Sequence, residues 1–293
     1  MNIRLITRTA GYVLWVEAGF MLLPLLVSLG YGDGCWEAFL SSALLCGVLG
    51  ALAYLVPVTR MRMQGRDGYA AVALAWVALT LLGAFPYLLS DTIPSFVDAL
   101  FETASGLTTT GATIMTDVEA MSRGGMFWRM FTHWIGGMGV LVFIMAVLPM
   151  SGEHSMHIMR AEVPGPTVGK LVPRIKQTAK LLYLIYVALT VLNFLFLLLG
   201  GMPLFDAVCN AFATAGTGGF AVRNASMAAY SPYLQTVTTV FMLLFGVNFS
   251  CYYLLLMRQF RSVLRDEELR LYLIIVAGAI LLITWDLRGL YAT

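Results

Sequence analysis

Long apolar runs separated by short polar stretches dominate the chain. A helix needs about 20 mostly apolar residues to cross the hydrocarbon core of a membrane, and seven runs approach or exceed that length. They predict seven membrane-spanning helices, at residues 11–30, 36–57, 69–89, 127–149, 179–200, 233–257 and 269–287. The expected fold class is therefore an all-α polytopic membrane protein.

Two half-length segments lie between these spans, one between the third and fourth and one between the fifth and sixth. Both begin just after a proline, Pro94 or Pro203, continue without a helix breaker, and then become small and rich in hydroxyls and glycine. At an offset of 108 residues they match without a gap at Asp98 and Asp206, Ala99 and Ala207, Thr109 and Thr217, and Gly111 and Gly219. This order predicts two copies of a repeated unit, each a span, a pore helix, a filter loop and a second span.

Both loops have the composition of a cation path. A loop can lie inside a membrane only where protein or a water-filled cavity covers its polar backbone, and carbonyls that point at an ion meet that demand. Glycine permits the backbone angles that turn successive carbonyls inward, and threonine adds a hydroxyl. The first pore helix, expected at residues 95–106, directs its negative carboxyl-terminal dipole at the same point. The candidate ion-binding residues are Thr109, Thr110, Gly111, Thr217, Gly218 and Gly219.

Basic residues indicate the orientation. If the seven spans alternate, 14 of the 18 Lys and Arg residues fall on one side, which the positive-inside rule makes cytoplasmic. These are Arg4, Arg8, Arg60, Arg62, Arg66, Arg160, Lys170, Arg174, Lys176, Lys180, Arg258, Arg261, Arg265 and Arg270. The amino terminus is therefore expected in the cytoplasm, and both pore segments enter from outside. Because 59% of residues are hydrophobic and only 12% charged, a soluble domain is excluded, and the net charge of +2 needs no nucleic-acid partner.

Two charged residues near the loops are candidate filter supports. Glu102 lies within the first pore helix, where it either bonds to the backbone behind the filter loop or sits as a partly solvated residue at the rim. Arg223 lies four residues beyond Gly219, where an unpaired cation would repel incoming ions. We therefore expect Arg223 to act as a paired structural clamp, with a gate as the alternative.

The fourth predicted span carries further polar residues. Arg129 and His133 are one helical turn apart and share a face; they either anchor the helix at the membrane interface beside two tryptophans or couple protons or ions. The glycines at positions 136, 137 and 139 are expected to allow close packing against the pore helix, with hinge motion as the alternative.

Three motifs carry a family resemblance. They are FETASGLTTTGAT at residues 101–113, FWRMFTHWIGGMG at 127–139 and NAFATAGTGGF at 210–220. Through them the chain resembles the Trk/Ktr/HKT superfamily of potassium transporters, and most of all the TrkH-type bacterial potassium uptake subunits. The resemblance implies four non-identical repeats around one pore, one filter glycine in each repeat, and two additional helices before the first repeat.

The resemblance also implies the ion, the membrane and the partners. Potassium would be the transported ion, with no organic cofactor in this chain, and the lipid bilayer would be that of the bacterial inner membrane. A complete subunit would form a homo-oligomer, with a TrkA-like nucleotide-binding regulatory subunit docked on its cytoplasmic face. Potassium would lie at Thr110, Gly111, Gly218 and Gly219.

The expected division of the chain follows the repeats. Residues 1–68 hold two accessory spans, 69–150 the first pore repeat, 151–178 a cytoplasmic connection, 179–257 the second pore repeat, and 258–293 a cytoplasmic loop with the first span of an incomplete third repeat. Two repeats supply only half of a four-loop filter, so the chain is expected to be a truncated part of a longer subunit.

Two other functions stay open at this point. The chain could be a non-conducting truncated or assembly subunit. An intramembrane enzyme would instead need a nucleophile and a base facing one another within the membrane. The candidate ionisable residues form no Ser–His, Asp–Asp or His-Glu-x-x-His arrangement in the sequence; they are Glu17, Glu102, Arg129, His133 and Asp286.

Overall fold

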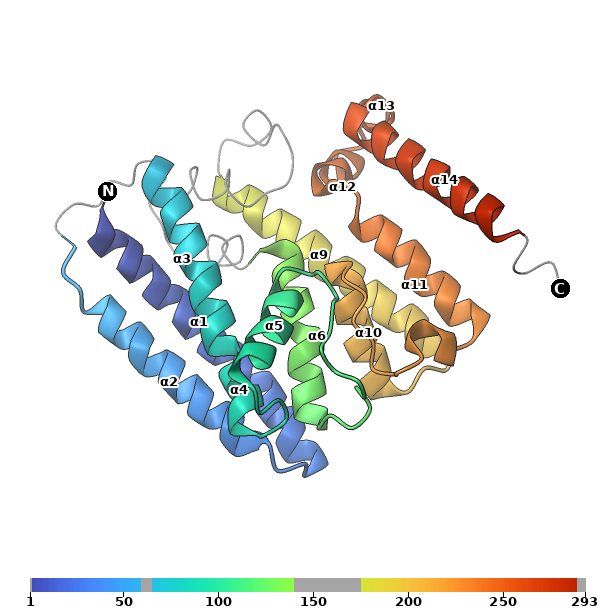
Figure 1. Ribbon diagram of the computed structural model, residues 1–293. Helices are drawn as coiled ribbons and strands as arrows, with labels where there is room; N and C mark the ends of the chain where they lie inside the picture. Colours follow the sequence, from blue (N-terminus) through green and yellow to red (C-terminus); the bar gives the residue numbers. More distant parts are fainter. Residues whose placement is uncertain (1, 59–64, 140–174, 289–293) are drawn as a thin grey trace.

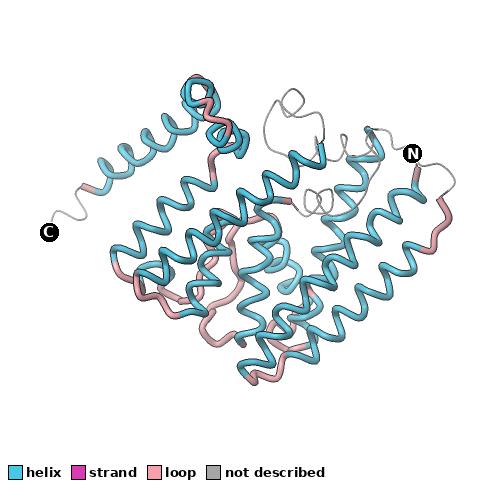
Figure 2. Tube along the Cα trace, turned by 180° about the vertical axis from the view of Figure 1, so that it is seen from behind, coloured by secondary structure: helices cyan, strands magenta, loops and turns pink. Residues whose placement is uncertain are grey.

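The computed structural model describes residues 2–58, 65–139 and 175–288 (Figure 1). Across these ranges the chain consists of helices joined by loops, with no strand among them (Figure 2). The helices are α1 (Ile3–Tyr31), α2 (Trp36–Tyr54), α3 (Gly65–Gly83), α4 (Phe85–Leu89), α5 (Phe96–Leu107), α6 (Arg123–Met138), α9 (Ile175–Leu199), α10 (Leu204–Gly216), the short 3-10 helix η1 (Ser226–Ala229), α11 (Pro232–Phe245), α12 (Phe249–Leu256), α13 (Phe260–Leu264) and α14 (Glu267–Leu287). The all-α, multi-pass fold class is confirmed.

Five helical segments in the described ranges are long and apolar enough to cross a membrane, and a bent pair adds a sixth if it counts as one span. The five are Ile3–Tyr31, Trp36–Tyr54, Arg66–Leu89, Ala179–Leu199 and Glu267–Leu287. They coincide with five of the seven predicted spans. The fourth predicted span begins earlier than expected, as α6, and its second half, from residue 140, lies outside the described residues.

The sixth predicted span is not one continuous helix. A single helix over residues 233–257 was the expectation, but α11 and α12 meet at an angle of 87°. The chain turns at Gly246, where an added Cβ would lie 2.5 Å from the hydroxyl of Tyr272 on α14. The lack of a side chain therefore lets α14 approach the turn, which a hydropathy pattern cannot register.

Side chains supply the backbone hydrogen bonds that the turn removes. Asn248 caps the first turn of α12 through its side chain. At the end of α11, the Tyr252 hydroxyl donates to the Leu244 carbonyl over 2.6 Å, and the Tyr272 hydroxyl donates to the Leu243 carbonyl over 3.0 Å. Two carbonyls at the end of α11 and one backbone N–H at the start of α12, groups that a helix end leaves without intrahelical partners, are thus satisfied by side chains.

The two half-length segments form the predicted pore helices. The first, α5, has 12 residues and begins after Ser95, whose hydroxyl accepts from the backbone N–H of Asp98. The second, α10, has 13 residues and begins directly after Pro203. At about 1.5 Å rise per residue, each spans only about 18–20 Å and cannot cross a bilayer alone.

The packing groups the helices around α6. Helix α1 packs against α2, α3 and α6, while α10 packs against α6 and α9 (Figure 1). One buried apolar cluster joins the amino-terminal helices with the first pore helix, and a second joins α9, α10 and α11. Trp134 and Met138 of α6 pack against both clusters, so α6 is the joint between the two halves.

Candidate functional site

The two loops that follow the pore helices have positive φ angles at two equivalent positions. Thr109 and Thr217 have φ angles of 54° and 56°, and Gly111 and Gly219 have φ angles of 76° and 87°. Positive φ is unusual for a β-branched residue and persists only where the surroundings enforce it. The repeat found in the sequence is therefore also a repeat in backbone geometry.

One backbone hydrogen bond recurs at the ends of both pore helices. The backbone N–H of Thr109 donates to the Gly106 carbonyl over 3.0 Å, and that of Thr217 donates to the Thr214 carbonyl, also over 3.0 Å. These donors and acceptors are equivalent positions in the repeat. Each pore helix therefore presents its negative carboxyl-terminal end to the loop that follows it.

The two loops touch one another through backbone atoms. A Cβ added to Gly111 would overlap the Gly218 carbonyl oxygen, and one added to Gly218 would lie 2.8 Å from the Thr109 carbonyl oxygen. Only glycine permits this approach. Among the described residues, no three His, Cys, Asp or Glu side chains gather as a metal site. The loop residues 109–111 and 217–219 carry oxygen only as backbone carbonyls and threonine hydroxyls.

Two glycines of α6 lie against the ends of both pore helices. A Cβ on Gly136 would overlap the carbonyl oxygen of Leu107, the last residue of α5. A Cβ on Gly137 would lie 2.5 Å from the Tyr186 hydroxyl and 3.0 Å from the Cα of Gly216, the last residue of α10. The predicted close packing of α6 on the pore helix is thus present, and it involves both pore helices.

Glu102 lies behind the first loop and is fully buried. Its carboxylate accepts from the Thr113 hydroxyl over 2.8 Å and from the Ile114 backbone N–H over 3.1 Å. It also accepts from Arg129 Nε over 2.6 Å. With 1% of its surface exposed, Glu102 is not the rim residue that was the alternative.

Arg129 links the two loops, a role that the sequence did not suggest. Besides Glu102, its guanidinium reaches the Ala221 carbonyl over 3.1 Å and lies 3.6 Å from the centre of the Phe220 ring. Thr113, which Glu102 holds, and Ala221 are equivalent positions of the two repeats. The interpretation of Arg129 as an interfacial anchor was wrong, because its side chain is only 1% exposed.

Arg223, which follows the second loop, is paired with two carboxylates. Its guanidinium lies 3.2 Å from the buried Asp206 carboxylate and 3.4 Å from that of Glu119. Tyr230 donates to the same Asp206 over 2.8 Å. Hydrogen bonding with Tyr230, together with the Asp206 charge, raises the pKa of Arg223 above its usual value. The cation near the loop is therefore neutralised by fixed carboxylates.

Asn224 joins the segments that follow the two loops, a contact that no motif in the sequence indicated. It accepts from the Val118 N–H over 2.8 Å, donates from its side chain to Asp117 over 2.8 Å, and donates from its backbone to Glu119 over 3.0 Å. The Asn224 hydrogen bond lowers the pKa of Asp117 below its usual value. The Asn224 side chain thus joins two segments that lie more than a hundred positions apart in the sequence.

These elements define a multi-pass membrane protein with two pore helices. A loop rich in glycine and threonine follows each pore helix, and the two loops contact one another through backbone carbonyls. The family model for TrkH, described as a cation transport protein, matches residues 37–292, and the chain belongs to this family. The family is one of transporters, which agrees with the expectation that the chain is not an enzyme.

Known relatives support the assignment. The Trk system potassium uptake protein TrkH of Salmonella typhimurium is 38% identical over 279 residues, covering 93% of this chain and 58% of that protein. The Trk system potassium uptake protein TrkG of Escherichia coli K12 is 33% identical over 290 residues, covering 97% and 60%. The crystal structure of the potassium transporter TrkH from Vibrio parahaemolyticus matches with a TM-score of 0.83 and 31% identity, covering 99% and 60%. This chain therefore spans about three fifths of the length of the relatives it matches.

Proposed function

We propose that the chain forms part of a potassium-conducting pore whose selectivity filter is lined by backbone carbonyls. The observation that carries the proposal is the repeated loop geometry: the same positive φ angles recur 108 residues apart, in two loops that touch through carbonyl oxygens. The named relatives are potassium uptake proteins, which favours potassium as the ion.

The proposed ligands are the six loop residues singled out in the sequence. Potassium would be held at Thr110, Gly111, Gly218 and Gly219, with Thr109 and Thr217 completing the two loops. Glu102 and Arg223 would support the filter from behind and beside it. Glu102 holds the segment after the first loop through Thr113 and Ile114. Arg223 is held beside the second loop by Asp206 and Glu119, and these contacts favour the supporting role.

The pore needs more loops than these residues supply. A closed ring of carbonyls takes about four loops, and the repeats at 69–150 and 179–257 contribute two. We propose that residues 1–68 are accessory spans, that 258–293 begin a third repeat, and that conduction requires a four-repeat subunit. The 293-residue chain alone would then support no potassium uptake.

Topology and partners complete the proposal. The amino terminus would lie in the cytoplasm of a bacterium whose inner membrane holds the protein, and the pore segments would enter from outside. A complete subunit would form a homo-oligomer and bind a TrkA-like nucleotide-binding regulator at residues 151–180 and 258–270. Most of the first of these stretches lies outside the described residues. Labelling cysteines introduced at Thr116 from outside and at Ser155 from inside tests the topology.

Rubidium uptake in potassium-starved cells that lack their own transporters tests the pore. In a four-repeat subunit carrying these 293 residues, Gly111→Ser and Gly219→Ser should lower the preference for potassium over sodium. Both positions have φ angles that disfavour a side chain, and at Gly111 the Cβ would also meet the other loop. Gly106→Ser, where the Cβ would overlap the Thr132 hydroxyl, should affect folding first.

A matched control is Gly19→Ser on α1, where an added Cβ meets nothing within 4 Å and the backbone is unstrained. It should leave expression and ion preference unchanged. If both filter variants keep wild-type ion preference at normal expression, the loops are not the filter.

A further inference from the structure

His133 is a buried polar side chain that none of the roles above uses. It lies in the middle of α6, has 0% of its surface exposed, and neither ring nitrogen has a hydrogen-bond partner within the described ranges. Buried polar groups without partners are rare in folded proteins because they lose hydration without replacement. A leucine would fill a similar space without that loss, so the imidazole needs a specific explanation.

The surroundings of His133 are the backbone of the second filter loop. A Cβ on Gly218 would overlap the imidazole Nε2, and one on Gly216 would lie 2.6 Å from the His133 carbonyl oxygen. The imidazole also lies 4.1 Å, between ring centres, from Phe220. His133 of α6 therefore contacts the last residue of α10, Gly216, and two residues of the second loop, Gly218 and Phe220.

The same point is where the two loops meet. A Cβ built on Gly218, the residue that contacts Nε2, would also lie 2.8 Å from the Thr109 carbonyl oxygen of the first loop. The imidazole thus stands behind the contact between Thr109 and Gly218, within reach of the backbone groups that carry the proposed ligands.

The charges around His133 favour a neutral ring. Arg129 lies one turn away on the same helix and contacts the same Phe220 ring. The nearest carboxylate in this network, Glu102, is already engaged by Arg129. A neutral imidazole keeps one donor and one acceptor and adds no second positive charge beside a cation path.

We propose that His133 is a positioning residue for ion selectivity: its neutral imidazole, through Nε2, fixes where the Gly218 backbone and the Thr109 carbonyl lie. The size and planar shape of the ring, packed against Gly218 and Phe220, set the geometry of the filter from behind; neither a charge nor a hydrogen bond within the described residues does so. The inference rests on the proposed pore function of the two loops.

The test compares His133→Gln, whose planar amide ends near the position of Nε2, with His133→Leu, which keeps a similar volume but places branched methyl groups there. In the four-repeat subunit, His133→Leu should lower the potassium-to-sodium preference by about fivefold or more, because the methyl groups cannot lie flat against Gly218 and the misfit displaces the loop. His133→Gln should restore most of it. Met130→Leu, a fully buried position elsewhere on α6, is the control and should leave the preference unchanged.

A second pair of variants covers a folding failure. Gly218→Ala should fold poorly because its Cβ meets the imidazole. Adding His133→Ala should recover part of the expression by removing that ring, while the 2.8 Å approach to the Thr109 carbonyl oxygen remains. A His133→Leu protein with unchanged ion preference overturns the inference if Gly111→Ser still lowers it. If His133→Leu does not fold and His133→Ala gives Gly218→Ala no recovery, the inference also fails. If Gly111→Ser and Gly219→Ser have no effect on preference, the pore assignment itself fails.

Discussion

Arg129 Nε and Glu102 Oε1 lie 2.6 Å apart, and both side chains are almost completely buried. This pair joins α6 to the first pore helix and, through the Arg129 contact with the Ala221 carbonyl, to the second loop. Removing one partner leaves an uncompensated charge in the protein interior, which typically costs about 3–5 kcal/mol.

Glu102→Gln should therefore lower the stability of the detergent-solubilised chain by about 3 kcal/mol, because Arg129 would stay charged without its carboxylate. Thermal unfolding followed by tryptophan fluorescence measures this. Glu119→Gln is the matched control, because Glu119 pairs with Arg223 at an exposed site and should cost at most about 1 kcal/mol. Equal effects of the two variants would show that the buried pair does not organise the fold.

Gly136→Ala should separate α6 from the first pore helix. Its Cβ would overlap the Leu107 carbonyl oxygen, and forced overpacking of this kind costs about 1–3 kcal/mol. The same substitution at Gly278 on α14, where nothing lies within 4 Å of an added Cβ, should be neutral or slightly stabilising because alanine favours helix. A Gly136→Ala chain with wild-type stability would contradict the close packing.

Asn224→Ala should change how stability depends on pH. The Asn224 amide holds the pKa of Asp117 below its usual value, so this contact stabilises the fold above the unfolded-state pKa of about 3.9 and is lost as pH falls through the lower folded-state pKa. The variant should be less stable than wild type at pH 7, and the gap should narrow toward pH 3. Unfolding series at pH 7, 5, 4 and 3 measure it, and a gap that does not narrow would assign the effect to the Val118 and Glu119 contacts alone.

The bend between α11 and α12 can be measured directly with spin labels. Labels at the exposed positions Thr239 and Leu255 would stand about 24 Å apart along a straight helix, at about 1.5 Å per residue. With the observed angle of 87°, the same rise gives a backbone separation of about 17 Å. A measured distance of about 24 Å would show that residues 233–257 form one continuous helix.

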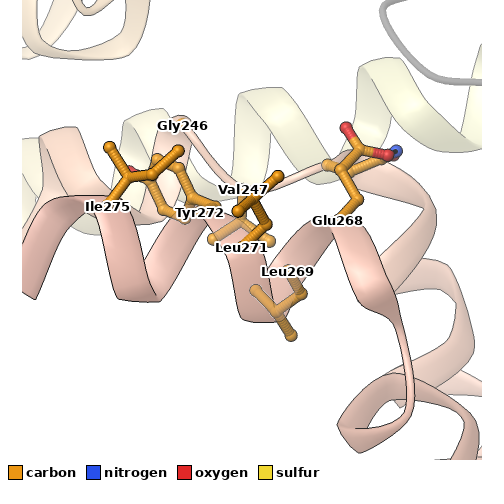
Figure 3. Close-up of a pocket in the computed structure, with 8 residues that line it drawn as sticks. Gly246, Val247, Glu268, Leu269, Leu271, Tyr272 and Ile275 are labelled. Atoms are coloured by element: carbon orange, nitrogen blue, oxygen red, sulfur yellow. Dashed lines mark hydrogen bonds between the residues drawn. The ribbon is translucent and has the colours of Figure 1, made fainter.

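A pocket lies beside this bend, and one residue that lines it, Tyr272, offers a second test. It is lined by Gly246, Val247, Asn248, Glu268, Leu269, Leu271, Tyr272 and Ile275, and encloses about 260 Å³ (Figure 3). Tyr272→Phe removes the hydroxyl that satisfies the Leu243 carbonyl and should cost about 1 kcal/mol of stability. Tyr233→Phe, whose hydroxyl makes only a 3.4 Å contact with the Phe196 carbonyl, should have a smaller effect.

The sequence by itself determined the features that depend on neighbours along the chain. The apolar runs fixed the five full-length spans, because the length of a helix in lipid follows from local hydrophobicity. The proline and serine before α5 and the proline before α10 placed the starts of the pore helices to within a residue or two, because helix capping involves adjacent positions. The repeat at 108 residues likewise placed the two loops.

Only the tertiary structure decided which of those residues meet. Arg129 reaches Ala221 across 92 positions and Val118 meets Asn224 across 106. The bend at Gly246 depends on a tyrosine of another helix. No local pattern encodes such contacts, because a side chain's burial and partner depend on how separate helices pack. An arginine near a tryptophan therefore looks the same in the sequence in two different situations. It can anchor a helix at the membrane surface, or it can join two loops in the interior.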